Sequence, residues 1–155
     1  MALQVGDKAP DFTLKNTDLE EVNLQSQLDK NVVLLFVPLA FTGVCTTELC
    51  DISQGLSAYE DVGARVLGIS VDSPFALKNW AEKEGITIPL LSDFNKEVSA
   101  AYGAQYEDLL GLRGVAKRSA FVIDREGVIR FASVSDDAKV LPDFEAIQAC
   151  LQELG

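Results

Sequence analysis

The sequence contains no histidine, and this absence excludes several kinds of catalytic site. Serine hydrolases and papain-like thiol enzymes use a histidine as general base, and most catalytic zinc sites use one as a ligand. Only three cysteines are present, Cys45, Cys50 and Cys150, and no paired spacing or fourth ligand completes a zinc site. We therefore expect neither a metal ion nor another bound cofactor.

The sequence also lacks a long hydrophobic run and a block of basic residues. The longest apolar run, residues 32–41, is about half of what a bilayer crossing needs, and Pro38 interrupts it. The N-terminus shows neither a basic leader nor an apolar signal segment. With a net charge of −11, the surface repels phosphate backbones. We expect a cytoplasmic protein that binds neither membranes nor nucleic acids.

The remaining composition is that of an ordinary globular protein, with 155 residues of which 48% are hydrophobic and 24% charged. No linker, repeat or low-complexity stretch divides the chain, so we predict a single domain over residues 1–155. An odd number of cysteines without a secretory signal indicates reactive or buried thiols rather than a disulfide framework.

Hydrophobic patterns predict an alternation of strands and helices. Strands are predicted at residues 12–15, 22–24, 32–37, 65–71, 89–91, 119–124 and 128–134. Helices are predicted at residues 45–59, 74–84 and 96–102, and from Pro142 onward. Asp72 and Ser73 supply an N-cap for the second helix, and Pro74 its first-turn proline.

This order favours an α/β fold, with a mixed central sheet, helices on both faces and an N-terminal β-hairpin extension. Residues 89–91 are expected to form a short edge strand. A thioredoxin-like arrangement fits the order. A flavodoxin-like sheet is the alternative, although residues 38–43 contain a single glycine where that fold needs a phosphate-binding loop.

Cys45 is predicted at the junction of a buried strand, a short loop and a helix, at the mouth of the domain. Unpaired N–H groups of the first helical turn and the positive end of the helix dipole favour a thiolate there. Without histidine, these groups and a nearby guanidinium are the means of activating the sulfur. Cys45 is therefore our candidate nucleophile.

Two residues near Cys45 could assist a nucleophilic thiolate. The Thr42 hydroxyl can cap the helix, face the thiolate and donate to an atom that gains negative charge. Glu48, one turn after Cys45, can hold an arginine in place. Each residue also has a purely structural interpretation, as an ordinary N-cap and as a first-turn acid.

The spacing of Pro38, Thr42 and Cys45 resembles the active-site motif of the peroxiredoxins, the thiol-specific antioxidant and alkyl hydroperoxide reductase family. Further resemblances span most of the chain, at residues 5–12, 68–73, 89–93 and 118–127. They imply a thioredoxin-like fold and a thiol-dependent peroxidase. Thioredoxin itself is disfavoured, because the chain has no Cys-x-x-Cys motif.

The resemblance also implies roles for single residues. Cys45 would be the peroxidatic nucleophile, shielded by Pro38, and Thr42 would hydrogen-bond the peroxide. Arg118 would stabilise the thiolate and the developing charge, and Glu48 would orient this arginine.

Arg118 also has a structural interpretation, as a solvent-facing residue at a strand start. Arg65 and Arg113 are weaker rivals for its role.

The spacing of Cys45 and Cys50 resembles the bacterioferritin-comigratory or Q-type peroxiredoxins, in which the second cysteine resolves the sulfenic acid. Residues 37–43 resemble instead the E-type alkyl hydroperoxide reductases, which can work with one cysteine. Residues five apart on a helix are separated by about 7.5 Å along its axis. A disulfide needs Cα atoms within about 7 Å, so this pair could close only after the first turn unwinds. Cys150 is expected to be structural.

The resemblance implies reduction of hydrogen peroxide or organic hydroperoxides through a sulfenic acid at Cys45. Thioredoxin, a similar protein or a low-molecular-weight thiol would be the reductant, and a homodimer would form near the active-site loops. Two alternatives stay open: a one-cysteine peroxidase recycled by an external thiol, and a peroxide-sensing redox relay.

Overall fold

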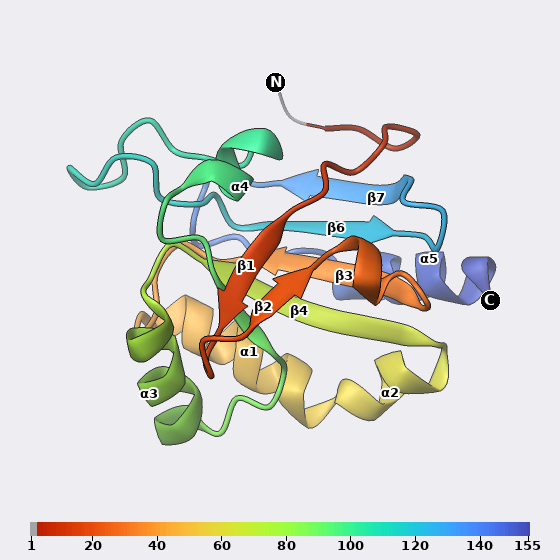
Figure 1. The fold of residues 1–155 in the computed structure, drawn as a ribbon, viewed down its shortest axis with the longest axis horizontal. Coiled ribbons are helices and arrows are strands. Elements are labelled where there is room, and N and C mark those ends of the chain that lie inside the picture. Colours follow the sequence, from red (N-terminus) through yellow and green to blue (C-terminus); the bar gives the residue numbers. More distant parts are fainter. Residues whose placement is uncertain (1–2) are drawn as a thin grey trace.

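A seven-stranded mixed β-sheet forms the centre of the molecule in the computed structural model, which describes residues 3–155 (Figure 1). The strands are β1 Thr13–Asn16, β2 Glu21–Asn23, β3 Asn31–Phe36, β4 Ala64–Ser70, β5 Leu90–Ser92, β6 Ser119–Ile123 and β7 Ile129–Val134. The helices are α1 Gly43–Gln54, α2 Leu56–Asp61, α3 Pro74–Glu84, α4 Glu97–Ala101 and α5 Phe144–Leu154, with a 3-10 turn η1 at Gln25–Gln27. None of these helices is long and apolar enough to cross a membrane.

The strands lie in the order β2-β1-β5-β4-β3-β6-β7. Strands β3, β4 and β5 run parallel, whereas the pairs β1–β2, β1–β5, β3–β6 and β6–β7 are antiparallel. This confirms the predicted mixed α/β sheet, and the β1–β2 hairpin is the predicted N-terminal extension.

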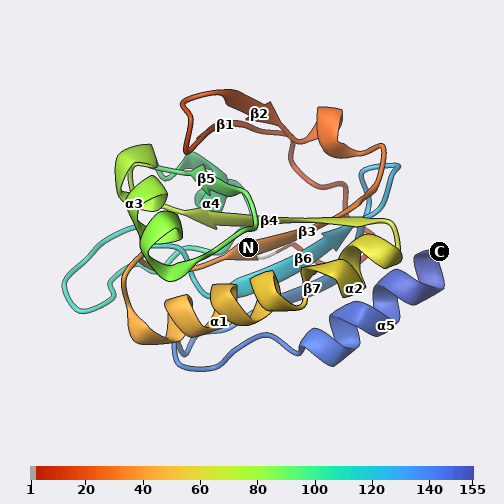
Figure 2. The same cartoon turned by 90° about the horizontal axis from the view of Figure 1, so that it is seen from below.

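Strand β3 separates two hydrophobic layers. Successive side chains of a strand point to opposite faces, and both faces of β3 are apolar. Val33 and Leu35 pack in a cluster with residues of α1, α2, α3 and α5. Val32, Leu34 and Phe36 pack on the other face, against the N-terminal segment and α4. Figure 2 shows α1, α2 and α5 along one side of the sheet and the hairpin on the other.

Some local expectations from the sequence were wrong. The strand predicted at residues 89–91 is not an edge strand, because β1 pairs with β5 on the side away from β4. The helix predicted over residues 45–59 is two helices, α1 and α2, with Gly55 between them. Helix α5 begins after Pro142, and Asp143 caps its first turn.

Helix α3 follows the sequence signals closely. The Ser73 hydroxyl accepts the N–H of Ala76 at 3.2 Å, and Pro74 occupies the first turn. Gly85 ends the helix with φ of 71°, a left-handed conformation that glycine adopts without steric cost. Ser73 alone is the cap, which leaves the Asp72 carboxylate available for other contacts.

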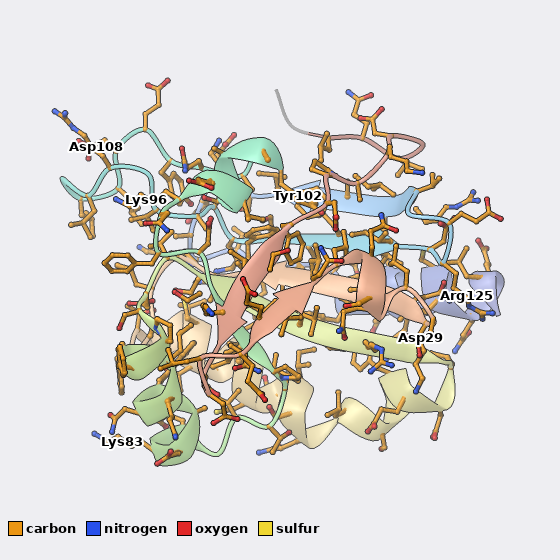
Figure 3. All side chains as sticks on the ribbon, viewed as in Figure 1. Asp29, Lys83, Lys96, Tyr102, Asp108 and Arg125 are labelled. Carbon is orange, nitrogen blue, oxygen red and sulfur yellow. The ribbon has the colours of Figure 1, made fainter. Side chains whose placement is uncertain are left out.

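Tyr102 connects the N-terminal segment to the sheet (Figure 3). Its ring lies 5.5 Å from that of Phe36 and 5.3 Å from that of Phe121, measured between ring centroids. Its hydroxyl donates to the Pro10 carbonyl at 2.7 Å. Burial raises the pKa of Tyr102, so the phenol stays neutral and can donate this bond.

Candidate active site

One end of the sheet collects the segments that carry the predicted site residues. Phe36, the last residue of β3, lies opposite Ser119, the first residue of the antiparallel strand β6. The chain that leaves β3 therefore meets the chain that enters β6, which places residues 38–45 beside Arg118. Strand β4 runs parallel to β3, so its last residue, Ser70, reaches the same end.

Arg118 forms the centre of a buried hydrogen-bonded group. Its Nη2 donates to Cys45 Sγ at 3.0 Å, and its Nη1 donates to Glu48 Oε1 at 2.7 Å. Its Nε donates to the carbonyl of Ala138 at 2.7 Å, in the loop after β7. Arg118, Glu48 and Cys45 are 2%, 1% and 0% exposed. The guanidinium thus holds the sulfur, the carboxylate and a loop carbonyl in one fixed geometry.

The pKa values of both partners of the Arg118–Glu48 ion pair are raised. Burial raises the pKa of Glu48 to about 7, although the neighbouring Arg118 pulls it down. Burial alone would lower the pKa of Arg118, but Cys45 and Glu48 outweigh it and raise the pKa. Glu48 Oε2 is buried without a hydrogen-bond partner. Arg118 therefore stays cationic, and its charged guanidinium lies against the Cys45 sulfur.

Thr42 occupies the N-cap position of α1, but its hydroxyl does not cap the helix. The hydroxyl donates instead to the Leu39 carbonyl at 2.8 Å, and the Thr42 carbonyl accepts the first helical bond, from the Thr46 N–H at 2.9 Å. The expectation of a hydroxyl cap was therefore wrong. Because this proton is engaged, the oxygen is left to accept a bond rather than donate one. Pro38, two residues beyond the end of β3, is buried.

The loop between β3 and α1 is strained and braced from several sides. Phe41 has φ of 65°, a left-handed conformation that costs a side-chain-bearing residue about 1–3 kcal/mol. Its ring lies 6.3 Å from that of Trp80, whose Nε1 donates to Thr46 Oγ1 at 2.9 Å. The Asp72 Oδ2 accepts the N–H of Ala40 at 2.7 Å. The sequence did not predict this contact. Its only signal was an acidic residue, Asp72, shortly after β4, the strand that pairs with β3.

Cys45 lies deeper than the sequence suggested. It was expected at the open mouth of the domain, whereas the structure leaves it no exposed surface. The preceding residues Phe41, Thr42 and Gly43 are exposed. Since Cys45 is covered, a molecule from solvent can reach the sulfur only after neighbouring groups shift.

The other two cysteines lie in surroundings that disfavour a thiolate. Cys50 is half-buried on α1, and its Sγ lies 3.4 Å from the Glu84 carbonyl. Burial and the acids Glu84 and Asp51 raise the pKa of Cys50. Cys150 is half-buried on α5, with Sγ 3.7 Å from the Arg130 carbonyl, and burial raises its pKa as well. All three cysteines are free thiols.

The two rival arginines lie elsewhere. Arg65 pairs with Asp29, Nη2 to Oδ2 at 2.9 Å, and Arg113 is exposed. Within the described residues, Arg118 is the arginine that donates to the Cys45 sulfur.

Comparison with known proteins agrees with this geometry. The family model described as AhpC/TSA family matches residues 5–132. The chain is 44% identical over 141 residues to alkyl hydroperoxide reductase E of Mycobacterium tuberculosis, which covers 89% of this chain and 90% of the relative. It is 41% identical over 146 residues to peroxiredoxin TSA1 of Saccharomyces cerevisiae, and this match covers 88% of this chain and 72% of the relative.

Solved structures give the same result. The crystal structure of peroxidoxin BcpB from Mycobacterium tuberculosis superposes with a TM-score of 0.86 and 30% identity, covering 97% of both chains. A peroxiredoxin-like protein from Aquifex aeolicus gives a TM-score of 0.89 and 28% identity, covering 99% of this chain and 89% of the other. The thioredoxin-like peroxiredoxin fold is thereby confirmed. The chain belongs to the AhpC/TSA family and is a peroxiredoxin, a thiol-dependent peroxidase.

Proposed function

We propose that Cys45 is the peroxidatic residue and that Arg118, Glu48, Thr42 and Pro38 complete its site. The observation that carries the proposal is the buried contact of 3.0 Å between Arg118 Nη2 and Cys45 Sγ. A guanidinium bonded to a sulfur favours the anion that attacks a peroxide, as histidine does in other thiol enzymes. The pKa values of Cys50 and Cys150 are instead raised, chiefly by burial and further by acidic neighbours.

In the proposed reaction the Cys45 thiolate attacks the terminal oxygen of a hydroperoxide. An S–O bond forms and the O–O bond breaks, so the sulfur is oxidised by two electrons and the departing oxygen is reduced. The departing oxygen takes up a proton and leaves as water or an alcohol. Arg118 stabilises the charge that moves onto this oxygen, and Thr42 accepts a hydrogen bond from the O–H of the peroxide. Pro38 shields the site from water.

Cys50 is the proposed resolving cysteine. Its sulfur would attack the sulfenic acid of Cys45, so that an S–S bond forms and water leaves. Both residues lie within α1, so its first turn must unwind before the sulfurs meet. After one equivalent of peroxide, mass spectrometry should find an intramolecular disulfide in the wild type and in Cys150→Ser, but a sulfenic acid in Cys50→Ser. An intramolecular disulfide that persists in Cys50→Ser would assign resolution to Cys150 instead, and a sulfenic acid that persists in the wild type would favour an external thiol as the resolving group.

Organic hydroperoxides and hydrogen peroxide are the proposed substrates, with a thioredoxin-like protein or a small thiol as reductant. Relatives named alkyl hydroperoxide reductase and peroxiredoxin support this choice. Sustained peroxide consumption with a thioredoxin system would support turnover. A single oxidation followed by slow recovery would favour the peroxide-sensing alternative.

A homodimer is proposed at the surface that carries Phe41, Phe75 and Phe94. Their side chains are large, apolar and exposed, and an exposed cluster of such side chains is typical of a protein–protein interface. Phe75 and Phe94 line one groove, and Phe41 contacts Trp80 on the same helix as Phe75. Sedimentation should give a dimer for the wild type and a monomer for Phe75→Glu.

We further propose that residues 1–155 form one domain and that the protein works in the cytoplasm. Three free thiols suit a reducing compartment. A single cooperative unfolding transition and cell fractionation would test these two statements.

Substitution of the nucleophile tests the central proposal. Cys45→Ser should abolish hydroperoxide consumption, whereas Cys150→Ser should retain the wild-type rate. Peroxidase activity that survives in folded Cys45→Ser would overturn the assignment of the nucleophile.

A further inference from the structure

The carboxylate of Asp72 is bonded to the loop that carries Thr42, although Asp72 does not touch the sulfur group described above. Its Oδ2 accepts the backbone N–H of Ala40 at 2.7 Å and a bond from the Ser70 hydroxyl. The Ser92 hydroxyl donates to the Asp72 carbonyl at 2.6 Å. Asp72 is thus anchored at the ends of β4 and β5 and connects them to the loop after β3.

The loop depends on such a bond because neither the sheet nor the helix holds its middle. The last bond to β4 is donated by the Val37 N–H to the Ile69 carbonyl, at 2.9 Å. The first bond of α1 is accepted by the Thr42 carbonyl. Between them, Phe41 adopts its left-handed conformation, which persists only where the surroundings fix it.

We propose that Asp72 is a positioning residue for peroxide reduction. Its bond to the Ala40 N–H keeps Phe41 in the strained conformation and so fixes Thr42 and the first turn of α1 around Cys45. A hydrogen bond from an N–H to a carboxylate is about twice as strong as one to a neutral oxygen. This bond is partly buried, so water and ions screen its electrostatic attraction only weakly. The inference rests on the proposed function, since it concerns the same site.

Two substitutions separate the bond from the charge. Asp72→Ala removes both bonds to the carboxylate. Asp72→Asn keeps an oxygen that can accept the Ala40 N–H without the charge. Asp93 offers a matched control, because it is a buried aspartate directly after β5 whose oxygens accept the N–H groups of Val98 and Ser99 at 3.1 Å and 2.7 Å. Its bonds hold α4 and do not reach the loop.

In stopped-flow mixing with peroxide, Asp72→Ala should slow oxidation of Cys45 roughly tenfold or more, equivalent to about 1.4 kcal/mol in the barrier. Asp72→Asn should recover part of this loss, and Asp93→Ala should stay within about twofold of the wild type. Alkylation of Cys45 by iodoacetamide should be at least as fast in Asp72→Ala as in the wild type. Alkylation needs no Thr42, and a loosened loop exposes the sulfur.

Trp80 supplies an independent signal, because it is the single tryptophan and its ring contacts Phe41. Its emission should change in Asp72→Ala and not in Asp93→Ala. If Asp72→Ala does not fold, Asp72→Asn is compared with Asp93→Asn, and a rate loss of about threefold is expected only in the former.

Equal peroxide rates in the Asp72 and Asp93 variants would overturn the inference. So would a parallel loss of the peroxide and alkylation rates, because Asp72 would then act on the whole site rather than on the loop. Failure of the proposed function would be recognised by a different result. Peroxidase activity would then survive in Cys45→Ser, whatever the rates of the Asp72 variants.

Discussion

The two ends of β6 each carry an arginine–carboxylate pair with the same separation and opposite surroundings. At the start of the strand, Arg118 and Glu48 lie 2.7 Å apart and their side chains are 2% and 0% exposed. At the other end, Arg130 and Asp124 lie 2.7 Å apart and are 47% and 9% exposed. Figure 3 shows the neighbouring Arg125 at this second end.

The carboxylates differ in how completely they are bonded. Asp124 accepts the N–H groups of Glu126 and Val128 as well as the arginine, and although burial acts to raise the pKa of Asp124, these bonds lower it. Glu48 has one oxygen without a partner, and its pKa is raised. One pair closes a hairpin. The other leaves one carboxylate oxygen without a partner in the buried group that includes Cys45, and perturbed buried groups of this kind mark candidate functional sites.

Substitution of each arginine by lysine should show the largest contrast. An ammonium cannot bond Cys45, Glu48 and Ala138 at once, as the guanidinium of Arg118 does. Arg118→Lys should lower the second-order rate constant for peroxide roughly 100-fold or more. Arg130→Lys should leave it within about twofold. Stopped-flow kinetics would measure both, and similar losses would remove the functional distinction between the two pairs.

The pH dependence of stability should distinguish the two carboxylates next. A raised pKa in the folded state stabilises the fold below the ordinary value of 4.5, and this stabilisation is lost as the pH rises to about 7. The free energy of unfolding of the wild type, relative to Glu48→Gln, should therefore fall by up to about 3 kcal/mol over this range.

Asp124 should behave in the opposite way. Its lowered pKa stabilises the fold above the ordinary value of 3.8, and the contribution is lost as the pH falls through the folded-state pKa. The difference between the wild type and Asp124→Asn should stay constant from pH 5 to pH 8 and shrink only in stronger acid. Denaturant unfolding at several pH values measures both differences. A Glu48→Gln difference that grows with pH would contradict the raised pKa.

The sequence could predict features that depend on local signals, but not contacts between distant segments of the chain. The position of Cys45 followed from local signals, because Pro38 ends a buried strand and a helix pattern begins after it. The hydrogen bonds of Arg118 to Cys45 and Glu48 join residues 73 and 70 positions apart, and no local pattern specifies which arginine makes them. Only the family resemblance selected Arg118.

Errors in the prediction have the same physical origin. Strand β5 was taken for an edge because its partner β1 lies about 75 residues earlier in the chain. The Thr42 hydroxyl was expected on the helix, but the left-handed turn at Phe41 directs it to the Leu39 carbonyl. The bond from Asp72 to the loop joins residues 32 apart. Each feature depends on tertiary contacts that override local preference.

The smallest expected effect concerns the response of the two pairs to salt. Arg130 is half-exposed, so its attraction to Asp124 is screened by ions and such a pair contributes little to stability. Between low salt and about 1 M sodium chloride, the stability of the wild type relative to Arg130→Gln should fall slightly. The stability relative to Glu48→Gln should not change, because ions do not enter the buried group around Arg118. An equal salt response of both differences would mean that water and ions reach Arg118, so that its environment would no longer differ from that of Arg130.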